Sequence, residues 1–190
     1  MASMIGSKDE RKEDKKFLTG KGRYTADINL HNQTYAIFIR SPHARAKIKS
    51  IDTSKAKKAS GVVDVLTGKE LQDDKIGGLI AGWKIVSKDG TDMKCPAHPA
   101  LATDTVNYVG DHVALVIAES LQEAKDAAEL VNVEYKVLKA VASTGQAMES
   151  DTIHEGIDKN LCFDWELGDK SKTDEAFSSA DKVVEMNIVN

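Results

Sequence analysis

The sequence predicts an α+β domain, and three observations carry that prediction. Residues 46–52 (AKIKSID) alternate between apolar and polar positions, as a strand with one wet face does. Residues 113–117 (VALVI) are apolar throughout, which favours a strand covered on both faces. A helical pattern follows this strand and a second alternating stretch follows the helix, so we expect a crossover strand–helix–strand unit.

The first part of the chain predicts short strands separated by turns. Residues 1–16 are polar, and we expect them to be mobile. The elements expected next are a strand over 34–40 that Ser41-Pro42 ends, the strand over 46–52, a short helix over 53–59 with Thr53 as its cap, a glycine-bounded strand over 61–68, and a helical turn over 69–74.

A long irregular excursion occupies residues 73–100. Within it, WKIV (83–86) precedes Asp89-Gly90, a favoured hairpin turn. The chain then returns toward the core.

The strand–helix–strand signal lies in residues 108–135. Gly110 precedes the buried strand, where glycine suits a left-handed or tightly packed backbone position. Ser120 and Glu123 match the capping-box spacing at a helix start. One apolar stripe then follows the helix, formed by Leu121, Ala124, Ala127, Ala128 and Val131. Residues 131–137 alternate again and predict the second strand.

The character of the sequence changes after Ala142. Residues 143–160 have the composition of a linker. The elements expected beyond it are a strand over 161–169, a short helix over 171–180 with Ala176, Phe177 and Ala180 facing inward, and a half-buried strand over 184–189.

Composition excludes several classes of protein. The chain has 190 residues, 41% hydrophobic and 29% charged, with a net charge of -4, as ordinary globular domains have. No apolar run approaches the roughly 20 residues that cross a bilayer, and the N-terminus lacks the apolar segment of a secretory signal. Two cysteines do not make a disulfide framework, so we expect a cytoplasmic protein.

Charge is distributed unevenly along the chain. Residues 1–60 carry 14 Lys and Arg against 6 Asp and Glu, whereas residues 61–190 carry 12 against 24. The basic residues of the first part are interleaved with acids and lack aromatic neighbours that could stack on bases. This pattern favours a solvated face, or a surface that meets an acidic partner, over a nucleic-acid site.

Short motifs with possible cofactor chemistry are weak. Gly20-Lys21-Gly22 is too short for a phosphate loop and predicts a turn. Cys95 and His98 have a spacing that could begin a zinc site, but a structural zinc needs about four ligands and the other histidines are scattered. Lys94 lacks the neighbours of a biotin- or lipoyl-carrying lysine.

Asp111 and His112 are the one candidate acid–base pair. They stand just before the apolar strand, and no serine or cysteine nucleophile with a third partner is evident in the sequence. Apolar strands often begin with polar residues, so the structural interpretation is preferred. The residues themselves therefore assign no catalytic, cofactor-binding or metal-binding position.

Four stretches in order resemble one enzyme family. Residues 11–28, 40–71, 100–141 and 161–190 are similar to successive parts of the molybdenum-cofactor-binding large subunits of the xanthine dehydrogenase/aldehyde oxidase family. Residues 82–94 and 160–169 look most like the aerobic carbon monoxide dehydrogenase large chain-like group. Together these stretches cover nearly the whole chain.

This resemblance implies an N-terminal α/β-hammerhead domain of a larger subunit. It implies a polar segment over 1–16, the hammerhead over 17–145, and a linker, strand and helix over 146–190 that lead toward a molybdenum-cofactor domain. The full enzyme would use molybdopterin cytosine dinucleotide with molybdenum, and FAD and [2Fe-2S] in partner subunits. The 190 residues alone would be an inactive scaffold with an exposed apolar patch, and the excursion over 73–100 would be its candidate region for contact with another domain or subunit.

The resemblance carries no functional residue onto this chain. The family's cofactor loops, active-site loop and glutamate base lie outside the matched stretches, so no catalytic, cofactor or metal residue is implied here. The substrate stays open among carbon monoxide, an aldehyde and a heterocycle. A naturally split subunit, or a stand-alone binding or assembly module without redox activity, is the alternative.

Overall fold

The structure is a computed structural model that describes Gly6 and residues 11–188. Its strands are β1 (Tyr35–Arg40), β2 (Ala46–Asp52), β3 (Val62–Thr67), β4 (Thr105–Val106), β5 (His112–Ala118) and β6 (Asn132–Val137). Its α-helices are α1 (Asp14–Leu18), α2 (Gly68–Asp73), α3 (Leu121–Glu129) and α4 (Lys170–Ser179). Its 3-10 turns are η1 (Thr25–Asp27), η2 (Ala56–Lys58), η3 (Thr144–Glu149) and η4 (Asp158–Asn160).

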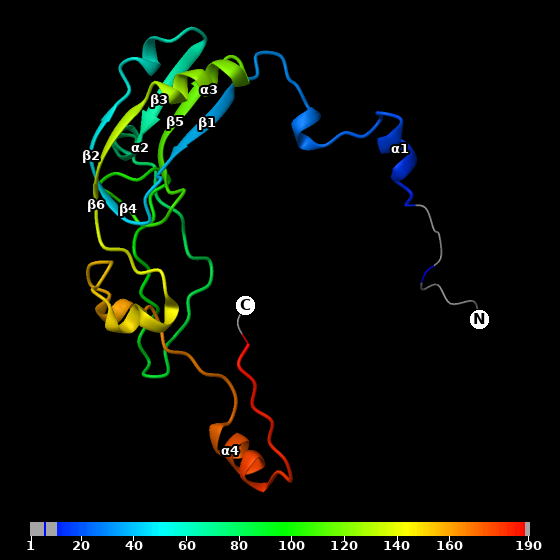
Figure 1. The fold of residues 1–190 in the computed structure, drawn as a ribbon, viewed down its shortest axis with the longest axis vertical. Helices are drawn as coiled ribbons and strands as arrows, with labels where there is room; N and C mark the ends of the chain where they lie inside the picture. Colours follow the sequence, from blue (N-terminus) through cyan, green and yellow to red (C-terminus); the bar gives the residue numbers. More distant parts are fainter. Residues whose placement is uncertain (1–5, 7–10, 189–190) are drawn as a thin grey trace. The chain divides into compact units, whose positions relative to one another are not determined.

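The strands form two three-stranded sheets with the orders β1-β5-β3 and β4-β2-β6 (Figure 1). In the second sheet, β2 and β4 are antiparallel, with Ala46 opposite Val106.

The chain divides into two compact units. One comprises the described residues within Met1–Ile39, together with Asp52–Val65 and Leu115–Asn132; the other comprises Arg40–Ile51 and Leu66–Ala114 and the described residues within Val133–Asn190.

Each unit has its own apolar core. In the first unit, the fully buried members are Ala56, Val65, Val116 and Ala127. In the second unit, the buried members are Ala46, Ile48, Ala102, Val106 and Val113. The strand–helix–strand unit predicted from the sequence is present, and its helix joins a strand of one sheet to a strand of the other. The predicted mixture of helices and strands is therefore confirmed.

Strand β5 and helix α3 follow the predicted pattern closely. None of the residues of β5 is exposed, as a strand covered on both faces requires. The Ser120 hydroxyl caps α3 by accepting the Glu123 N–H at 3.2 Å, and it donates to the Glu123 carboxylate at 2.7 Å. Ala124 and Ala127 of the predicted stripe are buried, whereas Leu121 is exposed.

The hairpin expected within the excursion is confirmed. Gly90 has a φ of +83°, and the Ser87 N–H donates to the Thr91 carbonyl at 2.8 Å across the turn. Val86 and Asp92 form an isolated antiparallel bridge beside it. Leu79 and His98 form a second isolated antiparallel bridge, and Asp73 still belongs to α2. The remaining residues of 73–100 are irregular, as predicted.

The helix predicted over 53–59 is wrong in length and in its cap. Only η2 forms there, and no side chain caps it. The Asp52 carboxylate accepts the Ser54 N–H at 2.9 Å, so an aspartate turn takes the place of the first helical turn. A full capping box stands instead at α2, where Thr67 and Glu70 bond reciprocally.

Two strands predicted near the C-terminus are wrong. Residues 161–169 and 184–188 are irregular, and Val189 lies outside the described residues. Alternation alone does not make a strand, because backbone donors and acceptors need a neighbouring strand. Helix α4 is present as predicted, but Ala176, Phe177 and Ala180 are exposed rather than inward. The predicted mobility of 1–16 falls mostly outside the described residues.

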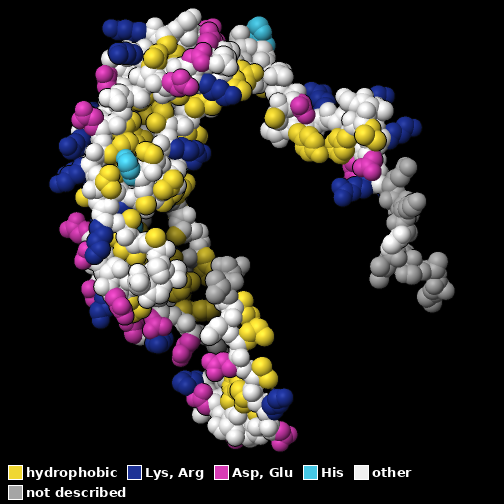
Figure 2. All heavy atoms as spheres, viewed as in Figure 1, with side chains coloured by type: hydrophobic (Ala, Val, Ile, Leu, Met, Phe, Trp, Pro, Cys, Tyr) yellow, Lys and Arg dark blue, Asp and Glu magenta, His cyan; other side chains and the backbone are white. Residues whose placement is uncertain are grey.

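The surface of the described residues carries many hydrophobic side chains (Figure 2). In the excursion, Leu79, Ile80 and Trp83 are 68%, 90% and 82% exposed. These exposed side chains are in line with the predicted apolar patch. That they form one continuous patch larger than a typical monomer shows stays a prediction. Within the described residues, no helix is both long enough and apolar enough to span a bilayer.

We expect Val65→Ala to lower the free energy of unfolding by about 2 kcal/mol, because it leaves a cavity in the core of the first unit. Val63→Ala is the matched control on the same strand, since Val63 is 58% exposed, and we expect a change within about 0.5 kcal/mol. Urea unfolding followed by circular dichroism measures both. Equal losses in the two variants would contradict the placement of Val65.

Candidate functional site

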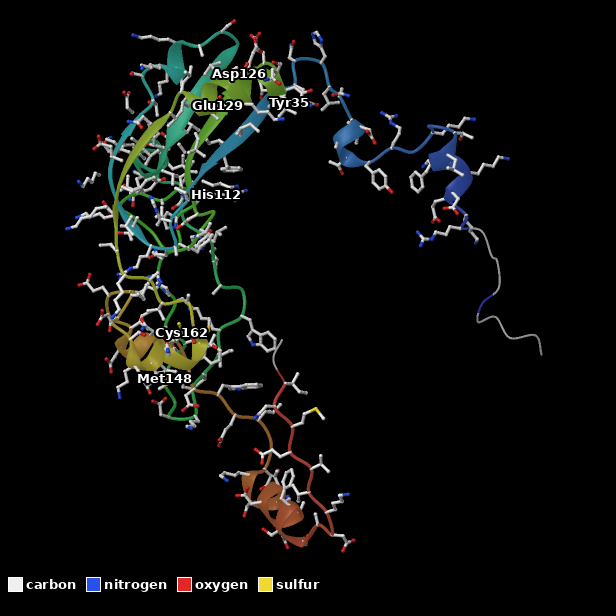
Figure 3. The ribbon with its side chains drawn as sticks, viewed as in Figure 1. Tyr35, His112, Asp126, Glu129, Met148 and Cys162 are labelled. Carbon is white, nitrogen blue, oxygen red and sulfur yellow. The ribbon has the colours of Figure 1, made fainter. Side chains whose placement is uncertain are left out.

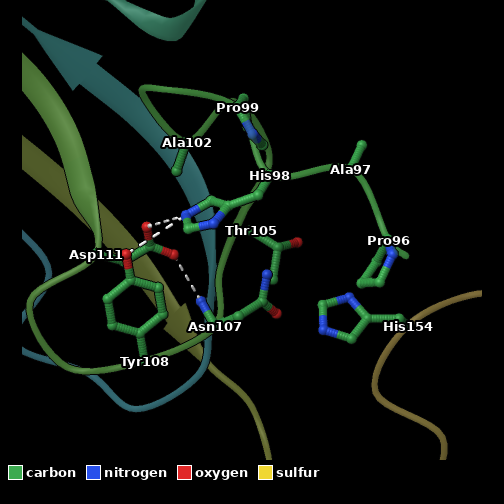
Figure 4. A pocket seen from close by; sticks show the side chains of 10 residues that line it. All are labelled: Pro96, Ala97, His98, Pro99, Ala102, Thr105, Asn107, Tyr108, Asp111 and His154. Atoms are coloured by element: carbon green, nitrogen blue, oxygen red, sulfur yellow. Dashed lines mark hydrogen bonds and ion pairs between the residues drawn. The ribbon is translucent and has the colours of Figure 1, made fainter. Parts of the chain in front are cut away.

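The candidate site is a hollow of about 330 Å³ in the second unit (Figure 4). Its polar lining comes from three parts of the chain. His98 stands at the end of the excursion, Thr105 to Asp111 include β4 and the loop before β5, and His154 follows η3. Pro96, Ala97, Pro99 and Ala102 supply apolar wall. The hollow thus combines a few polar groups with apolar surface, as ligand sites do.

Asp111 is the most buried polar group of the hollow, at 5% exposure. Gly110 before it has a φ of +94°, so of the two positions expected from the sequence it takes the left-handed one rather than the tightly packed one. The Asp111 N–H donates to the Tyr108 carbonyl at 3.2 Å, and the Asp111 carbonyl accepts the Ser41 N–H at 2.8 Å. Its Oδ2 accepts the Asn107 N–H at 3.0 Å. These bonds fix the carboxylate toward the hollow.

His98 faces this carboxylate from the opposite wall. Its Nε2 lies 4.0 Å from Asp111 Oδ1 and 3.4 Å from the Tyr108 hydroxyl oxygen. The His98 and Tyr108 rings meet edge to face, with centroids 6.0 Å apart. A histidine next to a carboxylate and a phenol can hold or exchange a proton with a polar ligand. The residues that line the hollow include no serine or cysteine to act as a nucleophile.

The pKa of Tyr108 is raised above its ordinary value. Partial burial is the largest cause, followed by the negative charge of Asp111 and the hydrogen bond to its carboxylate, while the charge of Arg40 acts in the opposite direction. The phenol therefore stays protonated to higher pH than an isolated tyrosine. Its single O–H lies within reach of the Asp111 carboxylate and of His98 Nε2.

The structure pairs Asp111 with a different histidine from the one adjacent in sequence. His98, thirteen positions earlier, faces its carboxylate, whereas His112 begins β5 (Figure 3). The His112 carbonyl accepts the Ala102 N–H at 2.7 Å and so joins β5 to the end of the excursion. Sequence reasoning missed the grouping of His98, Tyr108 and Asp111, since no periodic pattern links an irregular excursion to a loop.

The other short motifs take up structural positions. Gly20 has a φ of +68° and closes the turn after α1 by donating its N–H to the Phe17 carbonyl at 3.0 Å. Cys95 and Cys162 are free and exposed, and the Lys94 N–H donates to the Cys162 carbonyl at 2.9 Å. Across Gly6 and residues 11–188, no group of three or more His, Cys, Asp or Glu side chains could hold a metal ion.

A protein-family model matches residues 19–139. Its description is aldehyde oxidase and xanthine dehydrogenase, a/b hammerhead domain. The match covers the strands, helix α3 and the candidate hollow except His154. It confirms the family resemblance and the α/β-hammerhead fold that were read from the sequence.

Curated relatives and solved structures agree with this match. The carbon monoxide dehydrogenase large chain of Afipia carboxidovorans is 37% identical over 94% of this chain. The nicotine 6-hydroxylase large subunit of Paenarthrobacter nicotinovorans is 36% identical over 96% of it. The structure of reconstituted CO dehydrogenase from Oligotropha carboxidovorans superposes with a TM-score of 0.72 at 35% identity over 93% of this chain. This chain spans 22% of the length of each of them.

We expect Asp111→Asn to lower the pKa of Tyr108 toward its ordinary value of about 10, because the substitution removes the charge that disfavours the phenolate. The amide oxygen can still accept the Asn107 N–H. Titration of the Tyr108 ring carbon by NMR measures the pKa. Asp104→Asn, at an exposed aspartate in the same unit, is the control, and an equal shift there would contradict the assignment.

The same variant should change stability at high pH. Folding raises the pKa of Tyr108, so its contribution to stability is present below about pH 10 and is lost as pH rises through the folded-state value. Asp111→Asn should make that loss smaller. The loss is measured as the fall in the urea unfolding midpoint from pH 8 to pH 11, in the wild-type chain and in Asp111→Asn. An equal fall in both would argue against coupling between Tyr108 and Asp111.

Proposed function

Because the chain belongs to the aldehyde oxidase and xanthine dehydrogenase family through its a/b hammerhead domain, we propose that it serves as the N-terminal scaffold domain of a molybdenum hydroxylase large subunit. The match of the family model to residues 19–139 carries this proposal. The large chains and subunits among its relatives are about five times longer, which supports an activity carried by sequence other than these residues.

The described residues do not fit a molybdenum cofactor. No cluster of three metal-ligating side chains occurs among them, and Gly20 belongs to a turn rather than a phosphate cradle. In this proposal, molybdopterin cytosine dinucleotide is held elsewhere in the full subunit, and FAD and [2Fe-2S] belong to partner subunits. No chemical step is therefore derived from this chain, and these residues alone would not be catalytic.

The proposal also assigns the parts of the chain. The hammerhead occupies residues 17–145, and 146–190 lead toward the cofactor domain, in a cytoplasmic enzyme. The excursion over 73–100 is the contact region, because Ile80 and Trp83 expose nearly all of their apolar surface. Large exposed apolar side chains grouped in one segment are typical of surfaces that another domain covers.

A stand-alone binding or assembly module without redox activity is the second candidate. The hollow beside His98 favours it, because polar groups from three parts of the chain converge there on one concave surface. The two candidates differ in the size of the native protein and in its metal content.

The deciding experiment is the intact mass and molybdenum content of the protein isolated from its native host. The scaffold proposal expects a chain of roughly 80 kDa or more that carries molybdenum. A native chain of 190 residues without molybdenum and without a large partner would overturn it in favour of the binding module.

Within the scaffold proposal, Trp83→Ala should weaken association with a molybdenum-domain chain supplied separately by roughly tenfold or more, because interface tryptophans often carry much of the binding energy. Lys84→Ala is the matched control at the adjacent exposed position, with an expected change below about threefold. Surface plasmon resonance on the two variants measures both. Equal binding by the two would remove the excursion from the interface.

A further inference from the structure

Arg45, just before β2, is a cation without an acidic partner. Its guanidinium donates to the Lys139 carbonyl at 3.2 Å and to the Ile153 carbonyl at 3.0 Å. Both acceptors are neutral, and none of the ion pairs among the described residues includes Arg45. Its Nε is buried without a hydrogen-bond partner. The side chain is thus held in place while its positive charge stays uncompensated.

Arg45 lines a second hollow, of about 220 Å³. The apolar part of the lining comes from Ala44, Val109, Ala140, Val141, Ala142 and Ile153. Asn107 and Tyr108 complete it and also line the hollow beside His98. No carboxylate lines this second hollow, and Arg45 is the one charged residue of its lining. The cation therefore sits in a largely apolar pocket, where an opposite charge interacts more strongly than in water.

Size and charge together specify a ligand. An apolar cavity of about 150 Å³ holds benzene, so this hollow has room for a single ring with one small polar group. A carboxylate matches the planar fork of a guanidinium. A phosphate group, with more charge and more acceptor oxygens, would need further donors that the apolar walls do not offer.

We propose that the Arg45 hollow binds a small monocarboxylate with a compact apolar body, the carboxylate paired with the Arg45 guanidinium and the apolar body against the alanine and valine walls. The hollow beside His98 is unsuited to the same ligand, because the Asp111 carboxylate within it repels an anion. This site does not depend on the scaffold proposal, since every residue of it lies in this chain.

Benzoate is the probe, and benzamide is its neutral counterpart of the same shape. Titration of the full 190-residue chain, followed by NMR shifts of the amides of 44–45 and 140–142, should show saturable binding of benzoate. Benzamide should bind at least tenfold more weakly, because it brings no charge to the guanidinium. Acetate should also bind at least tenfold more weakly, because it lacks the apolar body.

Variants at Arg45 test the same site. Arg45→Gln should weaken benzoate binding by tenfold or more, and Arg45→Lys, which keeps the charge but not the fork, by a smaller factor. Arg23→Gln, the same change at an exposed arginine of the other unit, should leave it unchanged. Thermal unfolding by circular dichroism verifies that each variant is folded.

Three outcomes would overturn the proposal. Equal binding of benzoate and benzamide by the wild-type chain would exclude the charge pairing, even if Arg45→Gln failed to fold after losing its bonds to Lys139 and Ile153. Equal binding of acetate and benzoate would exclude the apolar part of the site. Undiminished benzoate binding by folded Arg45→Gln would place the ligand elsewhere.

Discussion

Burial of β5 on both faces is the constraint on which the rest of the structure depends. Val113 of this strand belongs to the core of the second unit, and Val116 belongs to the core of the first. One short apolar run of the chain thus supplies a buried residue to each core. The chain reaches this strand from the candidate site and leaves it for the capped helix α3.

The loop before β5 carries the buried carboxylate of the candidate site. The left-handed Gly110 turns the chain so that Asp111 is buried and yet fully engaged by Asn107, Tyr108 and His98. A buried carboxylate is tolerated only with such partners, because desolvation otherwise disfavours its charge. Asn107 and Tyr108 then stand between two hollows of opposite character, one containing the Asp111 carboxylate and the other containing Arg45. A single loop thus separates an anionic hollow from a cationic one.

The sequence was informative where a pattern had a neighbour to pack against. Strand β5 and helix α3 could be predicted because their apolar positions are buried in packed cores, and Gly90 and Gly110 because only certain backbone conformations favour glycine. The same alternation failed over 184–188, where the described chain offers no pairing strand. The candidate site could not be predicted in this way, since an irregular segment brings His98 to Asp111. The position of Arg45 could not be predicted either, because it is held by backbone carbonyls distant in the sequence.

The segment that follows α4 has a further consequence for any preparation of this chain. Residues 184–188 alternate as a strand would, and Val184, Met186 and Ile188 are each at least 74% exposed. No backbone hydrogen bond of these residues is found within the described part of the chain. An exposed apolar segment whose backbone donors and acceptors are unpaired within the described part of the chain can act as a template for strand addition. In concentrated solution this segment would favour self-association between copies of the chain. The cross-strand hydrogen bonds added by that association would be visible by spectroscopy.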